Sequence, residues 1–154
     1  MMFERTNKDD PRFHALVMML DHDLSGRYEN QNAEYAPFNT LESITAVILA
    51  LEENEAVGCS SFKPFDDHSV EMKRVFVKHT YRGRGIAKKM MAELETWAAE
   101  TGCTRAVLET GVNQPEAICL YEGIGYRRME NYEPYVGMKA SICYEKPLSS
   151  ITNP

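Results

Sequence analysis

A glycine-rich segment in the middle of the chain carries the residue types that bind a phosphate group. It consists of Arg82, Gly83, Arg84, Gly85, Ile86 and Ala87. Glycines let a backbone wrap closely around an anion, and the free N–H groups of a helix N-terminus lie at the positive end of the helix dipole. The two arginines add guanidinium groups that form charge-assisted hydrogen bonds. The segment therefore predicts a cradle for a phosphate or pyrophosphate, in which backbone N–H groups do most of the binding.

The elements on either side of this segment are those that such a cradle needs. Residues 70–77 are rich in β-branched and aromatic side chains, which is typical of a strand. Residues 85–101 repeat apolar side chains at the spacing of one helix face, and Gly102 is expected to end that helix. The sequence therefore predicts a strand, a glycine-rich turn and a helix in direct succession.

The part of the chain before the cradle predicts a strand, a short helix and a meander. Residues 13–20 are expected to form the first strand, and residues 23–37 a short helical region that begins at an aspartate cap and ends at a proline. Residues 45–51 and 56–65 predict a hairpin, which residues 70–77 extend to three antiparallel strands.

The part after the cradle predicts a strand, a helix and a last strand. Residues 105–110 are expected to form the strand, and Pro115 to begin a helix that Gly123 and Gly125 close. Residues 142–146 complete the pattern. No repeat or linker interrupts the chain, so we expect one domain, residues 1–154, of mixed α/β class with a central, mostly antiparallel sheet flanked by helices.

Composition and charge exclude several classes of partner. The net charge of −6 offers no basic face for nonspecific nucleic-acid binding, whereas an acidic surface suits a cationic substrate such as an amine. The longest aliphatic run, residues 46–51, is too short to cross a bilayer, and the N-terminus lacks the apolar segment of a signal peptide. We therefore expect a cytoplasmic protein with no membrane partner. The four cysteines form no C-x-x-C pair, which predicts buried thiols and no metal site.

Two motifs in order give the chain a resemblance to the GCN5-related N-acetyltransferase (GNAT) superfamily, over nearly its whole length. The first is Arg82-Gly-Arg-Gly-Ile-Ala87, which is similar to the superfamily's pyrophosphate motif. The second is Ala117-Ile-Cys-Leu-Tyr-Glu-Gly-Ile-Gly-Tyr126, which is similar to its second conserved block. The resemblance implies an acyl-CoA N-acyltransferase fold and an enzyme that transfers an acetyl group from acetyl-CoA to an amine.

The resemblance also implies which residues bind acetyl-CoA. Besides the cradle, Val75, Phe76 and Val77 are expected to pair with the pantetheine arm, and the backbone N–H groups around Phe76 and Val77 to bind the thioester oxygen. Many relatives have an asparagine where this chain has Gln114, with Asn113 just before it. Either amide could hydrogen-bond the pantetheine.

Two residues are candidates for the proton transfers. The resemblance places Tyr121 where a phenol could protonate the leaving thiolate, although a tyrosine on a helix can also be a packed core residue. It places Glu71 where relatives hold a base, although a strand carboxylate can equally form a cross-strand ion pair. Strand alternation predicts Glu71, Lys73, Val75 and Val77 on one face.

The acceptor is the least determined part of the prediction. Lys73 or Arg74 could hold a substrate carboxylate, which would suit an amino-acid-like amine, and the loop from Asn131, with Tyr132 and Tyr135, is the best candidate for a pocket wall. The leading prediction is acetylation of a primary amine of a small molecule. The alternatives are a protein amine as acceptor and a non-catalytic acyl-CoA-binding regulatory module. A homodimer is expected from family habit alone.

Overall fold

The computed structural model describes residues 1–27 and 40–149, and within them one sheet runs through the molecule. Its strand order is β1-β2-β3-β4-β5-β7-β6, and every neighbouring pair is antiparallel except β4 with β5. The strands are β1 (Met2–Thr6), β2 (Ala46–Glu52), β3 (Glu55–Asp66), β4 (Ser69–Val77), β5 (Arg105–Gly111), β6 (Arg127–Met129) and β7 (Ser141–Pro147). The mixed, mostly antiparallel sheet that the sequence predicts is confirmed.

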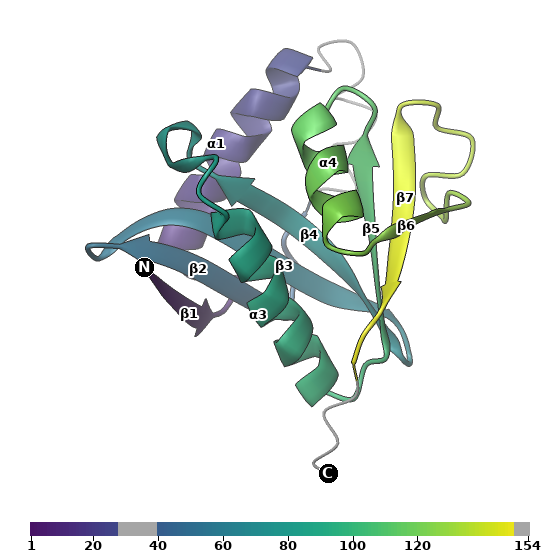
Figure 1. The fold of residues 1–154 in the computed structure, drawn as a ribbon, viewed down its shortest axis with the longest axis horizontal. Helices are drawn as coiled ribbons and strands as arrows, with labels where there is room; N and C mark the ends of the chain where they lie inside the picture. The colour runs from purple at the N-terminus through teal and green to yellow at the C-terminus, as the bar shows by residue number, and fades with distance from the viewer. Residues whose placement is uncertain (28–39, 150–154) are drawn as a thin grey trace.

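Helices cover both faces of this sheet (Figure 1). They are α1 (Pro11–Arg27), α3 (Ile86–Glu100) and α4 (Pro115–Gly123), with a short 3-10 helix η2 (His79–Tyr81) before α3. One core cluster packs α3 against the sheet through Met90, Met91 and Leu94, and a second packs α1 against the opposite face. No helix among the described residues is long and apolar enough to span a membrane.

The first predicted strand is wrong, because residues 13–20 lie inside α1. Phe13, Leu16, Val17 and Leu20 are all buried, and their spacing is that of one helix face. The helix begins where Asp10 accepts a hydrogen bond from the Arg12 backbone N–H at 2.9 Å, which is N-capping geometry. The first strand is instead β1, which pairs with β2.

The predicted short helix at residues 23–37 is wrong in its first part. Asp23 and Ser25 lie in the last turns of α1 and cap no new helix. The remainder, with Tyr28, Tyr35 and Pro37, lies outside the described residues.

The other predicted elements are confirmed within a few residues. The hairpin of β2 and β3 closes through Glu53 and Asn54, whose φ angles of 49° and 68° form the two-residue turn that fits strand twist. The predicted helices and strands after the meander correspond to α3, β5, α4 and β7. Strand β6 was not predicted, because three residues are too few to show a period.

A β-bulge in β4 overturns the predicted alternation. Arg74 has a φ of 57°, and the pairing of β3 with β4 shifts by one residue between Ser61↔Lys73 and Cys59↔Phe76. Before the bulge Met72 packs into the α3 core, and after it Val77 does so. Glu71 and Lys73 therefore lie on the face opposite to Val75 and Val77.

Strands β4 and β5 form a fork at the centre of the sheet. Their parallel pairing runs from Ser69↔Arg105 to Met72↔Leu108, although β4 continues to Val77 and β5 to Gly111. Figure 1 shows the two strands diverging beyond the paired segment. The fork leaves the backbone of residues 73–77 facing the gap.

Candidate active site

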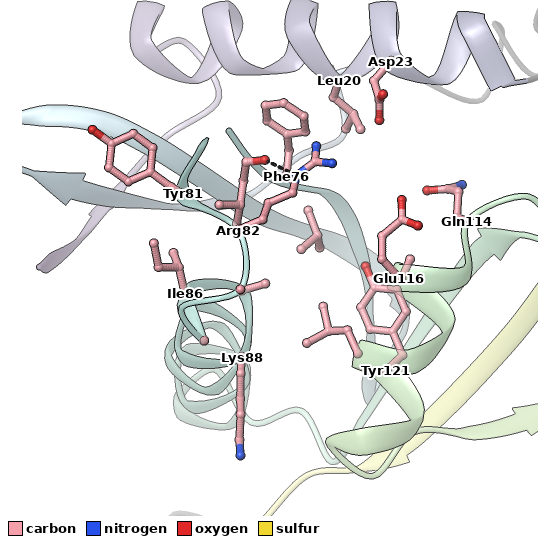
Figure 2. A pocket seen from close by; sticks show the side chains of 17 residues that line it. Leu20, Asp23, Phe76, Tyr81, Arg82, Ile86, Lys88, Gln114, Glu116 and Tyr121 are labelled. Carbon is pink, nitrogen blue, oxygen red and sulfur yellow. Dashed lines mark hydrogen bonds between the residues drawn. The ribbon is translucent and has the colours of Figure 1, made fainter. Parts of the chain in front are cut away.

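A cavity of about 270 Å³ opens at the fork (Figure 2). The end of β4, the start of α3 and helix α4 line it, and Leu20 and Asp23 of α1 close one side. Of the cofactor-binding residues that the resemblance implies, nine line the cavity: Val75, Phe76, Val77, Arg82, Gly83, Gly85, Ile86, Ala87 and Gln114. The candidate acid Tyr121 lines it as well.

The glycine-rich segment forms the predicted helix-end cradle. Gly83 and Gly85 have φ angles of 80° and 75°, in the left-handed region that favours glycine. Gly85 is the N-cap of α3, and no side chain caps the N–H groups of the first turn. Apart from its chain neighbours, no described residue lies within 4 Å of a Cβ built on either glycine, so both glycines border open space. These features fit the pyrophosphate of a coenzyme A thioester.

The two arginines of the cradle differ in placement. Arg82 lines the cavity, where its Nε donates to the Val77 carbonyl at 2.9 Å and its guanidinium lies over the Phe76 ring (Figure 2). Arg84 is not among the lining residues, and its guanidinium lies 5.1 Å from the centroid of the Tyr81 ring. The geometry therefore supports a direct role for Arg82 more than for Arg84.

The amide at the start of α4 shows a similar choice. Gln114 is the N-cap residue of α4 and lines the cavity, whereas Asn113 is exposed and is not among the lining residues. Of the two amides that the sequence leaves open, Gln114 is the one placed to reach a ligand in the cavity.

Tyr121 extends from α4 toward the fork (Figure 2). Its side chain is 7% exposed, and the Tyr126 ring packs against it edge-on at 5.9 Å. Burial raises the pKa of the Tyr121 phenol, and the negative charge of Glu109 raises it further. Tyr121 is thus fully protonated at neutral pH, as a proton donor must be.

Glu71 lies in a second group of polar residues, on the opposite face of the sheet. It is buried, and its Oε2 accepts a hydrogen bond from the Tyr132 hydroxyl at 2.7 Å. Its Oε1 lies 3.9 Å from Lys63 Nζ. Burial is the main reason that the pKa of the Tyr132 hydroxyl is raised. The negative charge of Glu71 and the hydrogen bond to it raise this pKa further. The structure thus joins two residues that the sequence proposed separately.

Glu109 is the site residue that sequence reasoning missed. It follows Leu108, the last residue of β5 paired with β4, and it shares the face of Glu71, since Leu108 packs into the α3 core. The Ser141 hydroxyl donates to Glu109 Oε2 at 2.7 Å. Burial is the main reason that the pKa of Glu109 is raised. The available signal was a single carboxylate that directly follows the apolar run Ala106–Leu108, shortly before the second motif.

Comparison with known proteins finds acetyltransferases both among family profiles and among individual relatives. The profile of the acetyltransferase (GNAT) family matches residues 13–126. An IAA acetyltransferase from Azospirillum brasilense is 30% identical over 146 residues, which cover 92% of this chain and 95% of that protein.

Solved structures share the whole fold. A Klebsiella pneumoniae protein assigned to the acyl-CoA N-acyltransferases has a TM-score of 0.80 and 29% identity, covering 96% of this chain and 97% of its own. A GNAT family acetyltransferase from Elizabethkingia anophelis, solved with acetyl-CoA bound, has a TM-score of 0.71 at 18% identity, with coverage of 96% and 97%.

Proposed function

Because the chain belongs to the GNAT family of acetyl-CoA-dependent N-acetyltransferases, we propose that its acceptor is the primary amine of a small molecule, amino-acid-like in character. The observation that carries this proposal is the fork between β4 and β5. A protonated phenol, Tyr121, lies in the cavity on one face, and the carboxylates Glu71 and Glu109 lie on the other. This arrangement supports a proton donor on one side of the fork and carboxylates for the acceptor amine on the other.

Acetyl-CoA supplies the reactive thioester when it binds. The N–H groups at the start of α3, with Gly83 and Gly85 shaping the turn, would hold its pyrophosphate. Arg82 would add a positive charge, and Gln114 a hydrogen bond to the pantetheine arm. The backbone of Val75 to Val77, which β5 leaves unpaired beyond the fork, would supply the strand-like pairing partner.

The carboxylates prepare the acceptor for attack. An amine with a pKa near ~10 is mostly ammonium at neutral pH, so it must lose a proton before it can attack. We assign this proton to Glu109, because burial raises its pKa toward the range in which a carboxylate acts as a base. The contacts of Glu71 with Tyr132 and Lys63 stabilise its charged form, so Glu71 would hold the acceptor's ammonium and not take its proton. Tyr121 would protonate the leaving thiolate.

Two other functions are separable from this one. A non-catalytic acyl-CoA-binding module would need the cradle, yet it would gain nothing from a buried phenol and carboxylates at the fork.

A protein amine as acceptor would require an open approach to the fork, whereas the loop from Asn131 lies over the acceptor side and is tied down there. The Asn131 side chain donates to the carbonyls of Tyr135, Met138 and Ser141 at 3.2, 3.3 and 3.1 Å.

The proposal is tested by thiol release from acetyl-CoA with a panel of small amines and short peptides. Tyr121→Phe should lower kcat about 100-fold or more while coenzyme A affinity stays unchanged, because only the proton donor is lost. Tyr126→Phe is the matched control, since it removes a neighbouring hydroxyl that bonds Glu95 outside the cavity lining. Glu109→Gln and Glu71→Gln compare the two carboxylates. A pH–rate profile that keeps its acidic limb in Glu109→Gln would reassign the base to Glu71.

A further inference from the structure

We infer that the acceptor carries a carboxylate as well as an amine, as an amino acid does, and that Lys73 is the residue that binds it. The inference rests on the proposed function, because both place the acceptor on the Glu71 face of the fork. It adds to that function the acceptor's carboxylate as a recognised group and the residue that recognises it, neither of which the fold or the family supplies.

The bulge in β4 separates the two cations that the sequence could not tell apart. Arg74 occupies the bulge, and its guanidinium forms an ion pair with Asp21 on α1. Lys73 precedes the bulge, so it keeps the strand alternation and points to the face of Glu71. Arg74 also reaches the α1 face, but Asp21 holds its guanidinium there, whereas Lys73 lies on that face beside Glu71. We therefore assign Lys73 to the acceptor.

The surroundings of Lys73 hold its ammonium in place at the fork. Lys73 is the residue directly after Met72, the last residue of β4 paired with β5. Its Nζ donates to the Tyr135 hydroxyl at 3.2 Å and lies 5.8 Å from the centroid of the Tyr135 ring. The loop that carries Tyr135 is itself fixed, because the Asn131 side chain donates to two carbonyls of the loop and to the carbonyl of Ser141, the first residue of β7. A fixed cation is a prepared anion site.

A half-buried cation beside two carboxylates matches a zwitterion better than a simple amine. Glu71 and Glu109 suffice to attract an acceptor's ammonium, and Lys73 would repel it. Burial lowers the pKa of Lys73, and the charges of Glu71 and Glu109 oppose that change. A carboxylate on the acceptor would pair with the Lys73 ammonium. This pairing would also offset the repulsion between Lys73 and the acceptor's own ammonium. Alternate residues of a strand are about 6.6 Å apart, which leaves room for the two charged ends of an amino acid between Glu71 and Lys73.

The test compares acceptors that differ only in the carboxylate. Phenylalanine and phenethylamine form one pair, and leucine and isopentylamine a second. In the wild type, kcat/KM should favour the amino acid about 10- to 100-fold, the range that one charge-assisted hydrogen bond contributes. In Lys73→Met this preference should disappear, and in Lys73→Arg most of it should remain. The ratio between the two acceptors is compared across variants, so a general loss of activity does not affect it.

Binding gives a readout that does not depend on turnover. With coenzyme A present, 3-phenylpropionate should bind the wild type and Lys73→Arg in calorimetry, and Lys73→Met should not bind it. A wild type that prefers the decarboxylated amines, or that acetylates no carboxylate-bearing amine, would overturn the inference, as would an unchanged preference in Lys73→Met. If Lys73→Met does not fold, the preference of the wild type and of Lys73→Arg decides. Failure of the proposed function would look different, because no amine of either class and no peptide would then be acetylated.

Discussion

Substitution of Gly85 separates the strain of a left-handed backbone from the binding of a ligand. Gly85 and Gly102 stand at the two ends of α3, with φ angles of 75° and 94°, and neither has an atom within 4 Å of a built Cβ. A side chain at either position therefore meets the same backbone strain and no clash among the described residues. Only Gly85 lines the cavity. The two glycines thus form a matched pair, one at the cradle and one at the far end of the helix.

The expected magnitudes follow from this geometry. Alanine in the left-handed region costs about 1–2 kcal/mol, so Gly85→Ala and Gly102→Ala should lower Tm by about 2–8 °C each in a chain of this size. Gly85→Glu would also place a carboxylate in the open space in front of the helix N-terminus. The loss of one charge-assisted hydrogen bond, about 1.5–3 kcal/mol, weakens coenzyme A binding about 10- to 100-fold. Gly102→Glu should leave the affinity unchanged.

Thermal denaturation and calorimetry with coenzyme A measure the two effects separately. The reasoning requires similar losses of Tm at both positions and a loss of affinity at Gly85 alone. Unchanged coenzyme A affinity in Gly85→Glu would refute the cradle. An equal loss of coenzyme A affinity in Gly102→Glu would show that both variants weaken binding by destabilising α3. The loss at Gly85 would then not identify a binding site.

Two further predictions concern stability. Glu109→Gln should raise the free energy of unfolding at neutral pH. The pKa of Glu109 is raised in the folded state, so ionisation of Glu109 opposes folding above that pKa. The gain in stability should therefore vanish as the pH falls below the ordinary glutamate pKa of 4.5. Urea denaturation at several pH values checks this, and a gain that grows toward acid would contradict the sign. Asp10→Ala should cost about 1 kcal/mol by removing the cap of α1, while Asp10→Asn, which keeps a capping oxygen, should cost less. Equal losses in the two variants, measured by the same method, would remove the capping role.

The parts of the fold that could be predicted are those whose pattern is local. The hairpin of β2 and β3, the glycine turn and α3 each carry their own periodicity and turn residues, and each was found where expected. Helix α1 is not predicted because its apolar residues, from Phe13 to Leu20, are dense enough to suit a strand as well as a helix. The signal that distinguishes the helix is also local: Asp10 caps it and Pro11 is its first residue.

The parts of the site that could not be predicted depend on pairing between distant residues. Arg74 takes a positive φ because Ser61 and Cys59 on β3 fix the pairing register on either side of it. No feature of residues 70–77 alone predicts this bulge. The role proposed for Glu109 depends on the separation of β4 and β5 after Met72. A sequence identifies a carboxylate within a strand, whereas the divergence of two strands is a property of the sheet.

The bulge also explains how one strand can serve two substrates. Without an extra residue, Lys73 and Val75 would share a face, and β4 would present charged and apolar side chains together on that side of the sheet. With it, the apolar Val75 and Val77 line the cavity that fits the thioester, while Glu71 and Lys73 lie on the opposite face, under the loop of Tyr132 and Tyr135. If Lys73 binds the acceptor as proposed, the donor side and the acceptor side have different chemistry on a single strand. A substitution at Lys73 should then change acceptor specificity and leave the cradle intact.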